Sequence, residues 1–186
     1  MGMKQTRNYI FPNTVHGSDI RSIRKMLRLS QKDFARFLCV SVKTVSAWEQ
    51  SDREISGMII PLIMILRDNL NLPDKYILPE QKTPLRLFYM YGNICCTVID
   101  VNERDRIIEI HNYVSNPQFR AFGTAENPTY EQYYEFLESR CIPRSRDKLK
   151  LELDHLGIPF YDPLLIIEKT QGRSADDAFW IRLERI

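Results

Sequence analysis

The first third of the chain is divided into short segments by serines that can cap helices. Ser18, Ser30 and Ser41 each precede apolar residues at helical spacing, and Asp33 follows Ser30 by three residues, as in a capping box. A serine hydroxyl at this position accepts a hydrogen bond from a free backbone N–H of the first helical turn. The spacing therefore predicts three short helices between residues 18 and 50.

The second and third predicted helices are separated by a very short connection. Only Cys39, Val40 and Ser41 remain between them, which forces a tight turn. The second helix would bury Phe34 and the third would turn Trp48 inward. Two short helices that cross at such a turn form a helix-turn-helix, whose second helix fits the major groove of DNA.

Residues 20–56 carry a family resemblance in the sequence IRSIRKMLRLSQKDFARFLCVSVKTVSAWEQSDREIS. This segment resembles the phage-repressor-like (XRE-type) helix-turn-helix regulators through LSQKDFA, the V-S-x-x-T-V-S-x-W-E stretch and the charged turn that follows. With the next apolar helix, the resemblance covers about the first 70 residues. Two positions depart from the family pattern: Cys39 replaces the usual turn glycine, and Ala47 stands where Arg or Gln often precedes the tryptophan.

The resemblance also implies roles for individual residues. Gln31 matches a residue that clamps a backbone phosphate, and Arg53 is a candidate phosphate contact. Arg24 and Glu49 match an ion pair that links the first helix to the end of the third. The resemblance places five residues of the third helix toward the groove or the phosphates: Val42, Lys43, Thr44, Ser46 and Ala47. Lys43 could donate to guanine, whereas Val42 or Ala47 could pack on a thymine methyl group.

Charge is distributed unevenly about a proline-rich segment. Residues 1–72 carry 11 Lys and Arg against 6 Asp and Glu, a net charge of +5, and the other 114 residues carry 15 against 18, a net charge of −3. Pro73, Pro79 and Pro84 mark a linker between these parts. We therefore predict an N-terminal arm at 1–16, a helix-turn-helix domain at 17–72, a linker at 73–84 and a second domain at 85–186.

The second domain combines strand and helix patterns. Apolar runs at 85–91, 94–101 and 106–113 predict an antiparallel meander, and Thr129 and Asp162 are expected to cap helices. Residues 178–183 fit either a short helix or a strand. The predicted fold class is α+β: an all-α N-terminal bundle of four to five helices, then a smaller antiparallel sheet with three or so helices.

Polar pairs of the second domain are the candidates for chemistry: Glu109 with His111, Asp154 with His155, and Asp176 with Asp177. The last pair is expected in the first turn of a helix, where acids are favourable. The sequence has no glycine-rich phosphate loop, metal-ligand spacing or nucleophile elbow. We therefore expect no enzymatic activity, no metal and no cofactor.

Cysteine usage and apolar runs restrict the location of the protein. The four cysteines show no C-x-x-C spacing, which favours reduced thiols in a cytoplasmic protein. The apolar run 58–66 has nine residues, too few to span a membrane. Its helix is apolar around nearly its whole circumference, so one face is available for a second copy or for the second domain. The basic residues at 140–150 alternate with acids, as on a solvated surface.

Residues 128–181 resemble a small domain of regulators that accompany HipA-like kinase toxins, through R-C-I-P-R-S-R and K-T-Q-G-R. The sequence predicts a transcriptional repressor that binds double-stranded DNA at a palindromic operator as a homodimer. The alternative is an antitoxin or phage-type inhibitor whose residues 85–186 neutralise a toxin or other protein, with autoregulatory DNA binding. A third possibility is a sensor whose second domain binds a small ligand. No membrane partner is expected.

Overall fold

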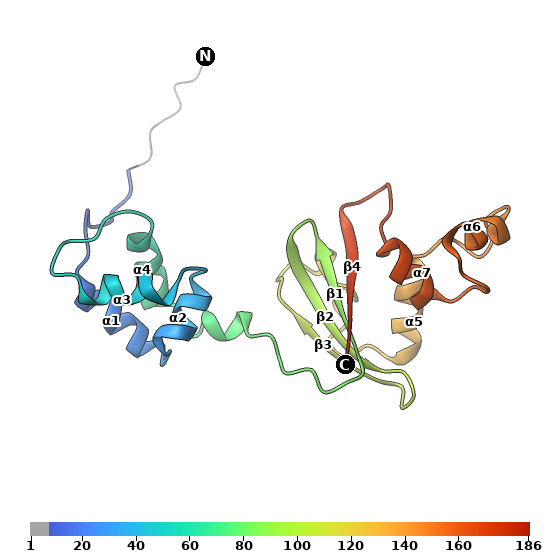
Figure 1. The fold of residues 1–186 in the computed structure, drawn as a ribbon, viewed down its shortest axis with the longest axis horizontal. Helices are drawn as coiled ribbons and strands as arrows, with labels where there is room; N and C mark the ends of the chain where they lie inside the picture. The colour runs from blue at the N-terminus through green and yellow to red at the C-terminus, as the bar shows by residue number, and fades with distance from the viewer. Residues whose placement is uncertain (1–7) are drawn as a thin grey trace, which may run out of the picture. The chain divides into compact units, whose positions relative to one another are not determined.

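A computed structural model describes residues 8–186 and separates the chain into two compact units, residues 1–78 and 79–186 (Figure 1). Helices make up the first unit. The second unit combines a four-stranded antiparallel sheet with helices. The predicted α+β class is therefore confirmed.

The described part of the first unit contains four α-helices and a short 3-10 helix. They are α1 (Gly17–Met26), α2 (Gln31–Phe37), α3 (Val42–Gln50), α4 (Ile59–Asp68) and η1 (Pro73–Tyr76). The predicted caps of α2 and α3 are confirmed, since the Ser30 hydroxyl accepts from the Asp33 N–H at 3.1 Å and Ser41 from Thr44 at 3.0 Å. The cap predicted for the first helix is wrong. This helix begins before Ser18, because the Asp19 carboxylate reaches back to accept from the His16 N–H at 2.9 Å.

A single apolar core holds the four helices together, with Ile20, Phe34, Val45 and Ile63 all fully buried. The packing of α1 on α3 is close because Gly17 has no side chain. A Cβ atom at residue 17 would lie 2.3 Å from the Trp48 carbonyl oxygen. Glycine is therefore required here for close approach.

We predict that Gly17→Ala lowers the free energy of unfolding of the first unit by about 1–3 kcal/mol, because the added methyl group must push α1 away from α3. Alanine is otherwise the better helix former, so helix propensity predicts the opposite sign. Urea denaturation followed by Trp48 fluorescence in a Trp180→Phe background measures the change, since the chain has two tryptophans. Ser18→Ala, at an exposed neighbouring position, is the control. Stabilisation by Gly17→Ala would contradict the packing argument.

The second unit is built on a sheet with strand order β3-β2-β1-β4. Its strands are β1 (Leu85–Tyr91), β2 (Ile94–Asn102), β3 (Ile107–Asn112) and β4 (Phe179–Arg185), and every neighbouring pair is antiparallel. The predicted meander corresponds to β1, β2 and β3. The C-terminal segment, which the sequence left open between helix and strand, is β4 beside β1.

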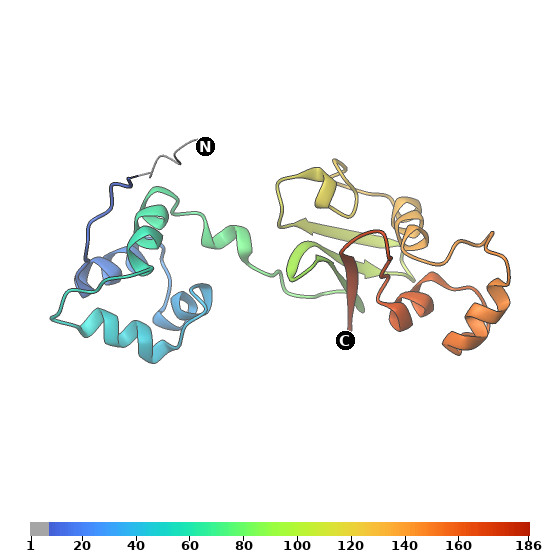
Figure 2. The ribbon, with the colours of Figure 1, turned by 90° about the horizontal axis from the view of Figure 1, so that it is seen from above.

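Helices α5 (Tyr130–Ser139) and α7 (Pro163–Thr170) lie on the same side of the sheet, and α6 (Leu149–Leu156) lies farther from the strands (Figure 1, Figure 2). Thr129 and Asp162 cap α5 and α7 as predicted. The core between the helices and the sheet includes the fully buried Leu87, Ile99, Tyr133 and Leu137. Burial raises the pKa of Tyr133, whose hydroxyl has no hydrogen-bond partner among the described residues.

The opposite face of the sheet contains a buried ion pair. Arg86 on β1 and Asp100 on β2 are register partners, and the guanidinium donates to the carboxylate twice, at 2.7 and 2.6 Å. Both residues are buried. Neither was predicted from the sequence to form an ion pair. Bidentate geometry offsets part of the desolvation cost of such a pair and fixes the pairing of these strands.

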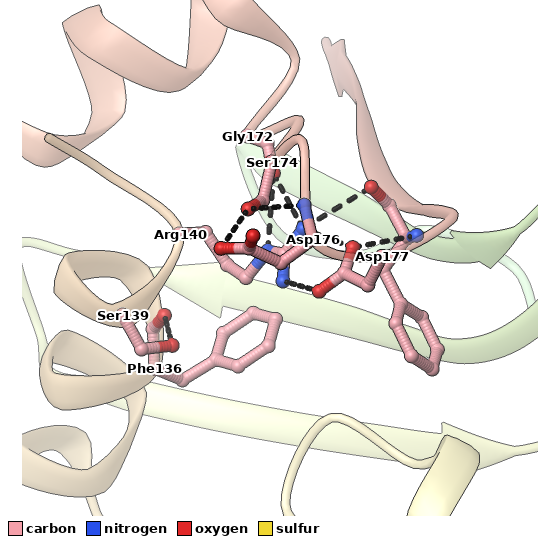
Figure 3. Close-up of polar contacts among 8 residues, drawn as sticks. Phe136, Ser139, Arg140, Gly172, Ser174, Asp176 and Asp177 are labelled. Atoms are coloured by element: carbon pink, nitrogen blue, oxygen red, sulfur yellow. Dashed lines mark hydrogen bonds and ion pairs between the residues drawn. The ribbon is translucent and has the colours of Figure 1, made fainter.

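Arg140, at the end of α5, fixes the loop between α7 and β4. Its guanidinium donates to the carbonyl oxygens of Gly172 and Phe179 and to both oxygens of the Asp177 carboxylate (Figure 3). The interpretation of Asp176 and Asp177 as first-turn acids is wrong, because the next element is a strand and Asp177 pairs with Arg140. Arg140 also differs from the solvated basic residues predicted around it, since its side chain is only 9% exposed.

Candidate nucleic-acid interface

The turn between α2 and α3 has the backbone conformation that the family pattern implies. Cys39 lies in the left-handed region at φ 55°, where glycine is favoured. The N–H groups of Cys39 and Val40 donate to the carbonyl oxygens of Arg36 and Ala35, at 3.1 and 2.9 Å. These bonds hold the turn and set the direction in which α3 leaves it.

One face of α3 is open to solvent. Lys43 and Ala47 are exposed on it, one helical turn apart, and Val42 beside them is 45% exposed. The opposite face contains the buried Val45 and Glu49. The three residues expected to read bases therefore lie together on the accessible side of the helix.

The two hydroxyl candidates of α3 already have partners within the chain. The Thr44 hydroxyl lies 2.8 Å from the Ser41 hydroxyl in the first turn, and the Ser46 hydroxyl accepts from the Gln50 amide at 3.2 Å. Both residues are half-buried. A hydroxyl can rotate and accept as well as donate, so these contacts leave each one able to meet a phosphate.

Arg53 lies in the turn that follows α3 and is exposed. The Ser51 hydroxyl both accepts from the Arg53 N–H at 3.1 Å and donates to its carbonyl oxygen at 3.2 Å. The backbone of Arg53 is therefore held in place, and its side chain is exposed beyond the end of α3.

The carboxylate of Glu49 connects α1, α2 and α3. Arg24 of α1 donates Nε–H to Oε1 at 2.6 Å and Nη2–H to Oε2 at 2.9 Å. Gln31 of α2 donates its amide N–H to Oε2 at 2.9 Å. The Glu49 side chain is 1% exposed and that of Arg24 is 14% exposed, so this pair is almost fully removed from water. The structure brings together the predicted ion-pair partners and adds Gln31 to them.

The environment of Glu49 favours its ionised form. The hydrogen bond from Arg24 is the main cause that lowers the pKa of Glu49; burial acts in the opposite direction, and the bond from Gln31 lowers it further. The same contact raises the pKa of Arg24. Both groups are therefore charged at neutral pH, which keeps the three helices in one arrangement.

Two residues of this surface were missed in the sequence. Arg21 donates to the Glu49 backbone carbonyl at 2.8 Å, which ties α1 to the end of α3. Gln50 is exposed and lies seven residues after Lys43, on the same face of α3. Its helical spacing from Lys43 and Ala47 is the sequence feature that places it on this face. A glutamine at such a position can hydrogen-bond an adenine edge.

Comparison with known families agrees with this geometry. Residues 20–64 match the family model described as helix-turn-helix. The segment is therefore a helix-turn-helix domain of the phage-repressor-like (XRE) type. The class of protein that this domain defines is a DNA-binding transcription regulator.

No curated protein and no solved structure matches the chain. The family match ends at residue 64, so the resemblance of residues 128–181 to regulators that accompany HipA-like toxins stays a prediction. Within residues 8–186, no group of His, Cys, Asp and Glu side chains is arranged to hold a metal ion. No helix in the same residues is long and apolar enough to cross a membrane.

We predict that Glu49→Gln lowers the free energy of unfolding of the first unit by about 3 kcal/mol at pH 7, because Arg24, whose side chain is only 14% exposed, is left charged without an anion. The folded-state pKa of Glu49 is lowered, so its stabilising effect is full above its unfolded pKa of about 4.3 and is lost as the pH falls through the folded value. The difference between the two proteins should shrink below about pH 4.

Urea denaturation between pH 7 and pH 3, followed by Trp48 fluorescence in the Trp180→Phe background, measures this difference. Asp52→Asn removes an exposed acid just after α3 and is the control. A difference between wild type and Glu49→Gln that stays constant over this pH range would show that the ionised carboxylate is not the source of the stability.

Proposed function

We propose that the protein is a transcriptional repressor that binds a palindromic operator as a homodimer. The observation that carries the proposal is the exposed face of α3, where Val42, Lys43 and Ala47 lie together on a helix held by Glu49. A single such module has a small footprint on DNA. Specific affinity normally comes from two modules on half-sites about one helical turn apart, which is why a dimer belongs to the proposal.

The charge of the two units supports a division of labour. Net charge is +5 for residues 1–78 and −3 for residues 79–186. A basic surface attracts the phosphate backbone, whereas an acidic one does not contribute to this attraction. We infer that residues 79–186 serve assembly and that DNA contacts come from the first unit.

The proposal includes no enzymatic activity and no cofactor. Burial raises the pKa of Cys95 to about 11 and that of Cys141 to about 12, and it also raises the pKa of Cys96. These thiols carry little thiolate at neutral pH and are poor nucleophiles. Asp177 forms an ion pair with Arg140, which gives this carboxylate a structural role in place of a chemical one.

A gel-shift assay with the DNA upstream of the gene for this chain tests the proposal, with salt titrated to count phosphate contacts. Binding to a palindrome within that DNA, and a steep fall in affinity with salt, are the expected results. A protein that is monomeric at micromolar concentration and still binds the palindrome tightly would contradict the dimer.

We predict that Lys43→Ala reduces the discrimination between the operator and a mismatched site by about 1–3 kcal/mol, because a base contact is lost. Lys32→Ala, which removes an exposed lysine from α2, is the matched control and should weaken both sites alike. Competition titrations with the two DNAs give the ratio. Unchanged discrimination in Lys43→Ala would remove Lys43 as a base-reading residue.

We predict that Gln31→Ala weakens binding to operator and mismatched DNA to a similar extent, because its expected contact is a phosphate. Its amide also holds Glu49, so the free energy of unfolding should fall by about 1 kcal/mol as well. Gln31→Glu keeps the size of the side chain but places a second carboxylate against Glu49, so it should lower the free energy of unfolding more than Gln31→Ala does. A change in sequence preference, rather than in overall affinity, would contradict a phosphate role.

A further inference from the structure

The two outer edges of the sheet differ. At the β4 edge, the Ile181 N–H donates to the Gln171 carbonyl at 2.7 Å, and Arg185 forms an ion pair with Glu168 of α7. Chain that packs beside β4 therefore occupies part of this edge. Among the described residues, no backbone hydrogen bond from outside the sheet reaches β3.

The β3 edge has little of the usual protection against pairing, since Glu109 is the one acidic or basic residue in the strand besides His111. Edge strands are commonly blunted by lysine, proline or a β-bulge. Strand β3 reads IIEIHN, contains neither residue, and pairs with β2 in an unbroken register. Ile107, at its beginning, is 49% exposed. Such an edge is a template for another strand.

The orientation of the free backbone groups follows from the ladder with β2. The Tyr113 N–H donates to the Cys96 carbonyl at 2.9 Å, just beyond the last paired residues of β3. Hydrogen-bonded pairs alternate along an antiparallel ladder, so His111 and Glu109 bond to β2 as well. The N–H and C=O groups of Ile108, Ile110 and Asn112 therefore point outward from the edge.

We propose that β3 pairs with β3 of a second copy of the chain, antiparallel, about a two-fold axis at Ile110. Ile110 then exchanges both backbone hydrogen bonds with Ile110 of the second copy, and Ile108 pairs with Asn112. The two sheets become one continuous sheet. This proposal rests on the homodimer of the proposed function and assigns its interface.

The side chains select this register. With the axis at Ile110, Glu109 lies opposite His111 of the second copy, and His111 lies opposite Glu109, on the face away from the helices. These are non-hydrogen-bonded pairs, in which side chains approach most closely. An axis at Glu109 would place two carboxylates opposite each other, and an axis at His111 would place two imidazoles opposite each other and separate Glu109 from His111. An axis at Ile108 or Asn112 would leave part of the strand unpaired.

The full-length chain carrying Ile110→Pro tests the backbone pairing. Proline removes an N–H that no hydrogen bond among the described residues uses, and edge strands tolerate it at such positions. We expect the dimer dissociation constant, measured by analytical ultracentrifugation, to rise by at least about tenfold, because two hydrogen bonds are lost per dimer. Leu183→Pro is the matched control on β4: its N–H also points outward, two residues after Ile181, and it too is a partly buried core residue.

A charge exchange tests the register without a change in the backbone. Glu109→Lys places a lysine opposite His111, and His111→Glu places a glutamate opposite Glu109. Each single variant should weaken the dimer by roughly tenfold, and the double variant should restore it. The register would be overturned if the double variant had the same dimer dissociation constant as the two single variants.

A wild-type chain that is monomeric at 100 μM, or a dimer that Ile110→Pro leaves unchanged while Leu183→Pro dissociates it, would overturn the proposal. DNA binding is measured separately, on a duplex with one half-site at low salt, which requires no dimer. Loss of half-site binding by a wild-type dimer would refute the proposed function and not the interface. If both the proposed function and the β3 interface are correct, monomeric Ile110→Pro should keep its affinity for the half-site. Its affinity for the palindrome should fall.

Discussion

The position of the recognition helix depends on one buried carboxylate. Glu49 stands at the end of α3 and is held by Arg24 from α1 and by Gln31 from α2. Arg24 also donates to the Leu29 carbonyl at 3.0 Å, so the turn between α1 and α2 belongs to the same network. Because burial makes each unsatisfied charge costly, the three helices have few alternative arrangements that keep every partner. The exposed face of α3 is thus presented at a fixed angle.

This network acts together with two features of the backbone. Gly17 lets α1 approach the end of α3, and Cys39 accepts a left-handed conformation in the turn before it. The side chain at position 39 costs about 1 kcal/mol relative to the glycine that the family pattern favours. The turn still forms, because its N–H groups bond to the end of α2 and because the core below it is complete. Local strain is therefore tolerated where the surrounding packing determines the conformation.

What could be predicted from the sequence was set by short-range chemistry. Ser30, Ser41 and Thr129 predict the starts of their helices, because a cap and its N–H partner lie three residues apart. The pairing of Arg140 with Asp177 joins residues that are far apart in the chain, and no local pattern distinguishes Arg140 from the solvated arginines near it. The same holds for Arg86 and Asp100, and for the amide of Gln31, whose contact with Glu49 follows from the packing of α2 on α3. The family resemblance supplied the pair of Arg24 and Glu49, which periodicity alone does not.

The second unit follows the same logic at the level of the sheet. Arg140 ties the loop before β4 to the end of α5, and this contact places Gln171 beside the outer edge of β4. At the β4 edge, part of the backbone is therefore hydrogen-bonded within the unit. At the β3 edge, the outward N–H and C=O groups have no backbone partner among the described residues. The proposed homodimer on two half-sites needs a symmetric contact outside the α3 helices, because DNA occupies those helices in the proposed complex. A free strand edge meets this need, since antiparallel pairing of identical strands generates the two-fold symmetry that a palindrome requires.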